Sequence, residues 1–183
     1  MPKITRDQVK VPADVLPDVR DVYIENYLKA TRETGRLMLF ACDQKIEHMN
    51  KDFYGEGIDI ADLDPEHLFQ IGSQGVCGVV AGQRGLIAQY AADYPEINYL
   101  VKMNSKTNLV GTKQEDPYSP QLTDLDAVLA MRDAGVNIVG LGYTIYLGSE
   151  YESTMMAEAG ELIAQAHANG LLVVLWIYPR GKA

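Results

Sequence analysis

The sequence has few of the features of a secreted, membrane-bound or nucleic-acid-binding protein. Its only two cysteines, Cys42 and Cys77, lie inside apolar runs, so we expect buried reduced thiols and no disulfide. No block of Lys or Arg stands out and the net charge is −9, which argues against nucleic-acid binding through a basic face. No stretch approaches the roughly 18 consecutive apolar residues of a membrane span, and the N-terminus lacks the apolar core of a signal peptide. We therefore expect a cytoplasmic protein with no membrane and no nucleic-acid partner.

Common catalytic and metal-binding motifs are also absent. There is no G-x-S-x-G, no Walker A sequence and no G-x-G-x-x-G. Glu47, His48, Asp52 and His67 do not have the spacing of a metal-binding helix or a zinc finger. The sequence therefore predicts no metal site.

What the sequence does contain is a regular alternation of apolar runs and helical patterns. A helix over residues 18–35, closed by Gly35, comes first, and a loop is expected at 112–121. The apolar runs cover 36–43, 76–83, 97–105, 136–143 and 171–178, and the helical patterns between them cover 64–75, 84–94, 122–135 and 149–170. Strands that are apolar on both faces and separated by helices predict a parallel α/β sheet.

Two folds fit this order of elements. Five strands are enough for an open doubly wound sheet. A (β/α)8 barrel needs eight units and typically about 250 residues, more than this sequence has. Both folds keep their chemistry at the carboxyl ends of the strands, so the residues there are the first candidates in either case.

Three residues at predicted strand ends have both a functional and a structural interpretation. Asp43 is either a loop cap or a carboxylate that moves protons at a strand mouth. Lys102 either faces the ligand side of the sheet, with Leu100 and Asn104, or extends outward to solvent. Tyr178 is either an aromatic residue of the rim or a proton donor.

Four segments at consecutive strand ends resemble the archaeal-type class I fructose-bisphosphate aldolase family, a group of DeoC-like enzymes. They are "LFACDQKIEHMNKDFYG", "YLVKMNSKTNL", "VGLGYTIYLGSEYE" and "VVLWIYPRGKA". The likeness extends from about Gly35 to Ala183. It implies a TIM (β/α)8 barrel, of which this chain would hold about the first five βα units, as a C-terminally truncated member.

The resemblance also implies a reaction and the residues that perform it. Members cleave or form a ketose phosphate, such as fructose 1,6-bisphosphate, through a lysine Schiff base and without a metal or cofactor. The products of cleavage are dihydroxyacetone phosphate and an aldehyde. Asp43 and Tyr178 match the family's proton-transfer residues, and Trp176 matches a residue that lines the site. Further candidates for substrate binding are Gln44, His48, Lys102, Tyr143 and Arg180.

The sequence departs from the family in two places. Many members have histidine and glycine after the aspartate, whereas this chain has Gln44 and Lys45. The family's Schiff-base lysine stands on the sixth strand, and its phosphate-binding loops follow strands seven and eight. We therefore expect the chain alone to be inactive, with Lys102 as the fallback nucleophile, and its apolar fifth strand to promote self-association.

Other readings of the chain remain open at this point. One is a non-catalytic five-stranded α/β module that binds a sugar phosphate or a partner. Another is a half-barrel that completes itself by dimerising and uses Lys102 as the nucleophile. In all cases we expect residues 1–36 to form a helical extension and 37–183 the partial barrel. The resemblance further implies a homo-oligomer and a small phosphorylated sugar as ligand.

Overall fold

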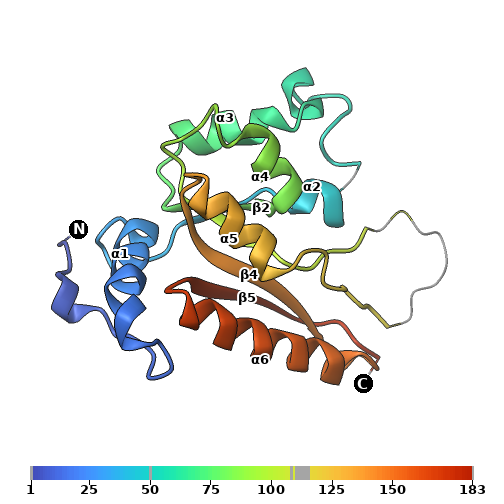
Figure 1. Ribbon diagram of the computed structural model, residues 1–183. Helices are drawn as coiled ribbons and strands as arrows, with labels where there is room; N and C mark the ends of the chain where they lie inside the picture. The colour runs from blue at the N-terminus through green and yellow to red at the C-terminus, as the bar shows by residue number, and fades with distance from the viewer. Residues whose placement is uncertain (1, 50, 108, 110–115, 183) are drawn as a thin grey trace.

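A computed structural model describes residues 2–49, 51–107, 109 and 116–182, and it contains one five-stranded parallel sheet (Figure 1). The strands are β1 (Leu39–Ala41), β2 (Val79–Gln83), β3 (Tyr99–Lys102), β4 (Ile138–Leu147) and β5 (Leu172–Pro179). The α-helices are α1 (Arg20–Thr31), α2 (Gln44–Glu47), α3 (Glu66–Gln74), α4 (Arg84–Tyr90), α5 (Leu125–Asp133) and α6 (Glu152–Ala168). Short 3-10 turns occur at η1 (Arg6–Gln8), η2 (Pro17–Val19) and η3 (Ile60–Leu63).

The strand order confirms a partial barrel and excludes the open doubly wound sheet. The strands pair in the order β1-β2-β3-β4-β5, each parallel to its neighbour in sequence. A doubly wound sheet reverses its strand order at a switch point and carries helices on both faces. Here α3, α4, α5 and α6 all contribute to one apolar cluster on a single face of the sheet. This arrangement is that of consecutive units of a (β/α)8 barrel.

The opposite face of the sheet, here called the inner face, has its own smaller apolar cluster. Strand residues alternate between the two faces, as the two-residue period of a strand requires. The inner-face cluster comprises Ala30, Leu39, Val79, Ala81, Leu100, Val139, Leu172, Val174 and Trp176. In β2 and β3 the residues two positions after Ala81 and Leu100 also face inward, and they are the polar Gln83 and Lys102.

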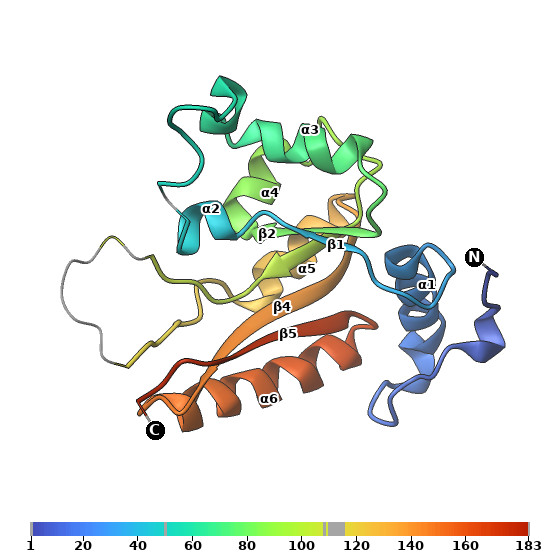
Figure 2. The same cartoon turned by 180° about the vertical axis from the view of Figure 1, so that it is seen from behind.

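Helix α1 lies across the end of the sheet where the strands begin. Ala30 of α1 belongs to the inner-face cluster. A Cβ added to Gly78 would lie 1.7 Å from the carbonyl oxygen of Ala30. Glycine is thus required where the chain enters β2. The amide of Asn26 also donates a hydrogen bond of 2.8 Å to the carbonyl of Gly170, just before β5. Figure 2 shows α1 at one end of the sheet and α2, with the C-terminal end of β5, at the other.

Two boundaries differ from those expected from the sequence. Helix α1 ends at Thr31, because Arg32 and Glu33 adopt left-handed backbone with φ of 51° and 59°; Gly35 lies beyond this turn. Strand β4 continues to Leu147, four residues past the predicted end, paired along its length with β5. Of the loop expected at 112–121, residues 112–115 lie outside the described residues. The division of the chain at residue 36 stays a prediction.

Strand β5 forms one edge of the described sheet. Among the described residues its only strand partner is β4, and Ile177 on its outer side is 52% exposed. None of the described helices is long and apolar enough to span a bilayer. The exposed apolar side chain on β5 is the feature expected to promote self-association.

Candidate active site

The carboxyl ends of β1, β2 and β3 place three polar side chains on the inner face. Asp43 follows β1, Gln83 ends β2, and Lys102 ends β3, where it pairs in register with Gln83. The exposed fractions of these residues are 4%, 7% and 1%. Buried polar side chains at this end of a parallel sheet mark the place where barrel enzymes hold their substrates.

Lys102 is held by two buried carboxylates. Its Nζ lies 2.9 Å from Oδ2 of Asp43 and 2.7 Å from Oε1 of Glu47, and none of the three side chains is more than 5% exposed. The ring centroid of Trp176 lies 5.0 Å from the same nitrogen, which places the ammonium over an aromatic face. The sequence-based expectation that Lys102 faces the ligand side is thus met by the geometry, whereas the outward orientation is not.

Glu47 is a member of this site that sequence reasoning missed. It had been considered only as a metal ligand. Asp43 is the residue before the one-turn helix α2 and Glu47 is its last residue, so one helical turn brings both carboxylates to the same side. The four-residue spacing of Asp43 and Glu47, directly after a predicted strand, could have indicated from the sequence that the two carboxylates lie together.

Burial dominates the electrostatics of Glu47. Loss of solvent raises the pKa of this carboxyl, while the nearby Lys102 ammonium and a hydrogen bond from Ser105 lower it by less. Asp43 adds a like charge that raises the pKa further. Two carboxylates therefore share one buried cation, and a proton is held more readily here than on a solvent-exposed glutamate.

Gln83 connects the acidic pair to the loop after β3. Its Nε2 donates to the backbone carbonyl of Asp43 at 3.3 Å and to Oγ of Ser105 at 3.4 Å. Oδ1 of Asp43 and Oε1 of Gln83 are buried and have no hydrogen-bond partner within the described part of the chain. A buried acceptor without a partner is costly, so these two oxygens are the natural contacts for a bound polar ligand.

The position of Trp176 depends on a glycine in the neighbouring strand. A Cβ on Gly142 would lie 2.5 Å from Cζ3 of Trp176 and 2.6 Å from Cδ2 of Leu100. Gly142 pairs in register with Lys102, and Trp176 pairs with Thr144. The missing side chain lets the indole lie against β4 and reach over Lys102.

Two tyrosines and two cations form the outer part of the site. Tyr146 and Tyr178 pair in register, and their rings stack with centroids 5.9 Å apart. The Arg180 guanidinium carbon lies 4.7 Å from the Tyr178 ring, and Nζ of Lys106 lies 5.8 Å from the Tyr146 ring. Burial raises the pKa of Tyr146 to about 12, with smaller effects from Glu47 and Arg180. Burial, Arg180 and Glu47 likewise act on the pKa of Lys106, and the net effect lowers it.

The remaining predicted residues lie in different places. His48 comes directly after α2, with Nδ1 3.9 Å from Oε2 of Glu47, and Gln44 begins α2. Tyr143 is a correction: its hydroxyl donates to Glu158 of α6, so its side chain is on the helix-covered face. Tyr146, three residues later, occupies the inward position that Tyr143 was expected to have.

Lys45, the second residue of the unusual "QK" pair, points away from the site. Its Nζ donates to the carbonyl of Asp62 and lies 5.1 Å from the Phe53 ring, so it fastens the loop after α2. His67 pairs with Asp62 at 2.8 Å. Within the described ranges, no group of three His, Cys, Asp or Glu side chains could hold a metal ion.

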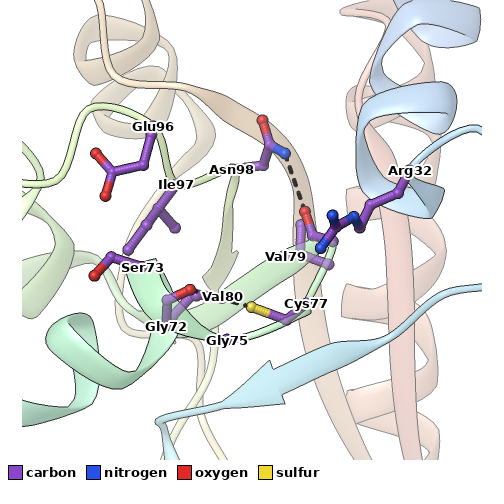
Figure 3. A pocket seen from close by; sticks show the side chains of 11 residues that line it. Arg32, Gly72, Ser73, Gly75, Cys77, Val79, Val80, Glu96, Ile97 and Asn98 are labelled. Atoms are coloured by element: carbon purple, nitrogen blue, oxygen red, sulfur yellow. Dashed lines mark hydrogen bonds between the residues drawn. The ribbon is translucent and has the colours of Figure 1, made fainter.

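A separate cavity of about 250 Å³ lies at the other end of the strands (Figure 3). Its walls include Ser73 and Cys77 before β2 and Asn98 before β3, and Figure 3 shows Arg32 and Glu96 on opposite sides of it. The Asn98 amide donates to the carbonyl of Gly78. Because barrel enzymes react at the carboxyl ends of their strands, the residues around Lys102 are the candidate site and this cavity is not.

Comparison with known proteins shows the family and agrees with the fold. A model of the DeoC/LacD family of aldolases matches residues 37–183. The chain belongs to this family. The expected resemblance to class I fructose-bisphosphate aldolases is confirmed, and so is the partial TIM barrel.

Three individual proteins show how close the likeness is. A Methanocaldococcus jannaschii protein named fructose-bisphosphate aldolase/6-deoxy-5-ketofructose 1-phosphate synthase is 52% identical over 98% of this chain. The structure of a fructose-bisphosphate aldolase from Slackia heliotrinireducens is 80% identical over the whole chain, with a TM-score of 0.96. A Schiff-base-forming fructose-1,6-bisphosphate aldolase, solved with reaction intermediates, is 27% identical over 88% of the chain, with a TM-score of 0.70.

The chain spans only part of the length of these proteins. It covers 58% of the Methanocaldococcus protein, 57% of the Slackia chain and 60% of the Schiff-base-forming aldolase. The described sheet corresponds to the first five strands of a barrel that has eight.

Proposed function

We propose that this chain provides the first part of a class I aldolase that cleaves or forms a ketose phosphate such as fructose 1,6-bisphosphate. The products of cleavage are dihydroxyacetone phosphate and an aldehyde. The observation that carries the proposal is the Asp43–Lys102–Glu47 cluster, buried at the carboxyl ends of the strands beside Trp176. Family membership supports the same chemistry, which requires neither metal nor cofactor.

The bond changes follow from an imine. A neutral lysine amine attacks the ketone carbon, and water leaves the carbinolamine to give an iminium. A base removes the proton from the hydroxyl on the aldehyde half, the carbon–carbon bond breaks, and its electron pair moves to the iminium to form an enamine. The enamine carbon is then protonated, and water releases the ketone and restores the amine.

We assign the imine-forming lysine to the missing strands and not to Lys102. A nucleophilic amine needs a free lone pair, whereas Lys102 forms ion pairs with both Asp43 and Glu47 and is fully buried. A cation held in this way supports electrostatic and proton-transfer steps better than nucleophilic attack. Lys45 is also unsuitable, because it is fastened to the loop at Asp62.

Asp43 and Tyr178 are the proposed proton-transfer residues. Oδ1 of Asp43 is buried without a partner among the described residues, so it can take the proton that the attacking amine releases and pass it to the carbinolamine hydroxyl, which then leaves as water. The Tyr178 ring stacks on Tyr146 and lies under Arg180, which places its phenol at the outer part of the site. Tyr178 would therefore act on the hydroxyl of the leaving aldehyde.

The test uses borohydride trapping and intact mass. The chain itself is incubated with dihydroxyacetone phosphate and borohydride, and we expect no adduct. In parallel it is fused to the part of the Slackia aldolase that it does not match, here called the extended chain, which should form one adduct and cleave fructose 1,6-bisphosphate. An adduct on Lys102 in the chain alone would overturn the lysine assignment.

The extended chain also separates this proposal from a non-catalytic module. A folded extended chain that binds a sugar phosphate but forms no adduct and cleaves no ketose phosphate would show that the half-barrel serves binding. Circular dichroism and a thermal melt establish that both samples are folded before the comparison is made.

A further inference from the structure

We propose that Glu47 is a positioning residue of this site, which, with Asp43, fixes the Lys102 ammonium under the substrate and so tunes proton transfer at Asp43. The inference rests on the proposed aldolase function and adds a residue to it. Glu47 does not touch the reacting atoms in this account. It acts through Lys102.

The geometry gives Lys102 little freedom. An ammonium has three N–H donors. One is used by Oδ2 of Asp43, a second by Oε1 of Glu47, and the Trp176 ring covers the nitrogen from another side. With Glu47 absent, Lys102 would keep one carboxylate and could turn within the space that Glu47 vacates.

The two carboxylates are not equivalent. Oδ1 of Asp43 has no partner among the described residues, whereas Glu47 is bounded by Lys102 through Oε1 and by His48 at 3.9 Å from Oε2. Asp43 thus has an oxygen left for a ligand, and Glu47 completes the charge around the lysine. This division gives each acidic residue a separate task.

Glu47 also contributes a negative charge to the whole site. The titratable groups that face it are Asp43 next to α2, His48 on the same loop, Lys102 and Lys106 at and after β3, and Tyr146 of β4. Burial raises the pKa of Glu47, and the Glu47 charge acts in turn on the pKa of Lys106 and of Tyr146, so removal of this charge changes the pH dependence of the site.

The experiment compares Glu47→Gln, Glu47→Asp and Glu56→Gln in the extended chain. Glu56 is an exposed residue in the segment that follows α2, so its variant controls for the loss of one acidic residue. For Glu47→Gln we expect kcat to fall by up to about 100-fold. KM should change little, because the substitution displaces Lys102 but leaves the substrate contacts in place. The acidic limb of the pH–rate profile should also move to lower pH, since burial raises the pKa of Glu47 and this carboxyl no longer titrates in the variant.

Glu47→Asp decides the matter if Glu47→Gln does not fold. It keeps the charge but withdraws the carboxylate from Lys102, so kcat should fall while the acidic limb stays in place. If either folded variant of Glu47 matches Glu56→Gln in both kcat and pH profile, the inference is wrong. Failure of the unsubstituted extended chain to form an adduct would instead count against the proposed function.

Discussion

The indole of Trp176 lies where a side chain at position 142 would be, against the bare backbone of Gly142. The register of β4 and β5 places both on the inner face, and the ring reaches from there to within 5.0 Å of Lys102. The absence of a side chain at Gly142 of β4 thus allows Trp176 of β5 to reach Lys102 of β3.

Replacement of Gly142 by alanine should therefore displace Trp176. We expect a loss of stability of about 1–3 kcal/mol from overpacking. Trp176 is the only tryptophan of the protein, so its fluorescence reports the displacement directly. Gly160→Ala in α6 is the control, since nothing lies within 4 Å of an added Cβ there, and alanine should stabilise that helix slightly. Equal melting temperatures and spectra for both variants would contradict the prediction.

Lys102→Met should be strongly destabilising near neutral pH. It leaves two carboxylates buried without their cation, which typically costs about 3–5 kcal/mol. The loss should shrink at low pH, because burial raises the pKa of Glu47 and this carboxyl then becomes protonated and neutral. Urea unfolding at two pH values measures this, with Lys29→Met, at the exposed pair with Glu25, as control. A cost that does not depend on pH would point to lost packing instead.

The stability of the chain should fall as the pH rises through the titration of Glu47. Burial raises the pKa of this carboxyl above its ordinary value of 4.5, so the folded state retains a proton that the unfolded state has released. The stabilisation is complete below 4.5 and is lost progressively as the pH rises to the higher pKa of the folded protein. Glu47→Gln removes this dependence. Urea unfolding across this range should therefore give a flatter curve for the variant, and parallel curves would refute the assignment.

Tyr178→Phe in the extended chain should reduce kcat for cleavage by about 10²–10⁴-fold, the contribution usual for a proton-transfer group. The imine precedes that step, so borohydride should still trap an adduct. Tyr27→Phe in α1 serves as the matched control, because that residue lies in the helix across the opposite end of the sheet. Unchanged kcat in Tyr178→Phe would remove this phenol from the mechanism.

The chain on its own should self-associate through β5. This strand has one described neighbour, and Ile177 is 52% exposed on it. Ile177→Lys should reduce the associated fraction, because a charge on an edge strand opposes pairing. Light scattering after size exclusion measures the mass. A sharp monomer with high thermal stability for the unsubstituted chain would argue against an open edge.

Much of the fold was accessible from the sequence because continuous apolar runs alternate with helical patterns along the chain. Those runs placed Asp43, Lys102, Trp176 and Tyr178 at the carboxyl ends of the first, third and fifth strands, and the structure brings Lys102 together with Asp43 and Trp176. The resemblance to a family then decided between an open sheet and a barrel, which the local pattern could not do.

The errors arose where local pattern carries little information. A single helical turn such as α2 has no measurable periodicity, so Glu47 was not recognised as a neighbour of Asp43. The end of β4 was placed four residues early, at Tyr143, although "TIYL" has the composition of a strand, and Tyr143 was therefore chosen in place of Tyr146. Positions of side chains around Lys102 depend on register between strands, which no single segment encodes.

The hydrogen bond from Asn26 to Gly170 has a consequence for the order of folding. It joins residues 144 positions apart, and His167 of α6 likewise meets Asp14 at 2.8 Å. Closing so long a loop is entropically unfavourable until the intervening chain is compact. These two contacts therefore cannot form until α6 and β5 are in place, so the segment around Asp14 and Asn26 should be among the last to become protected from hydrogen exchange during refolding.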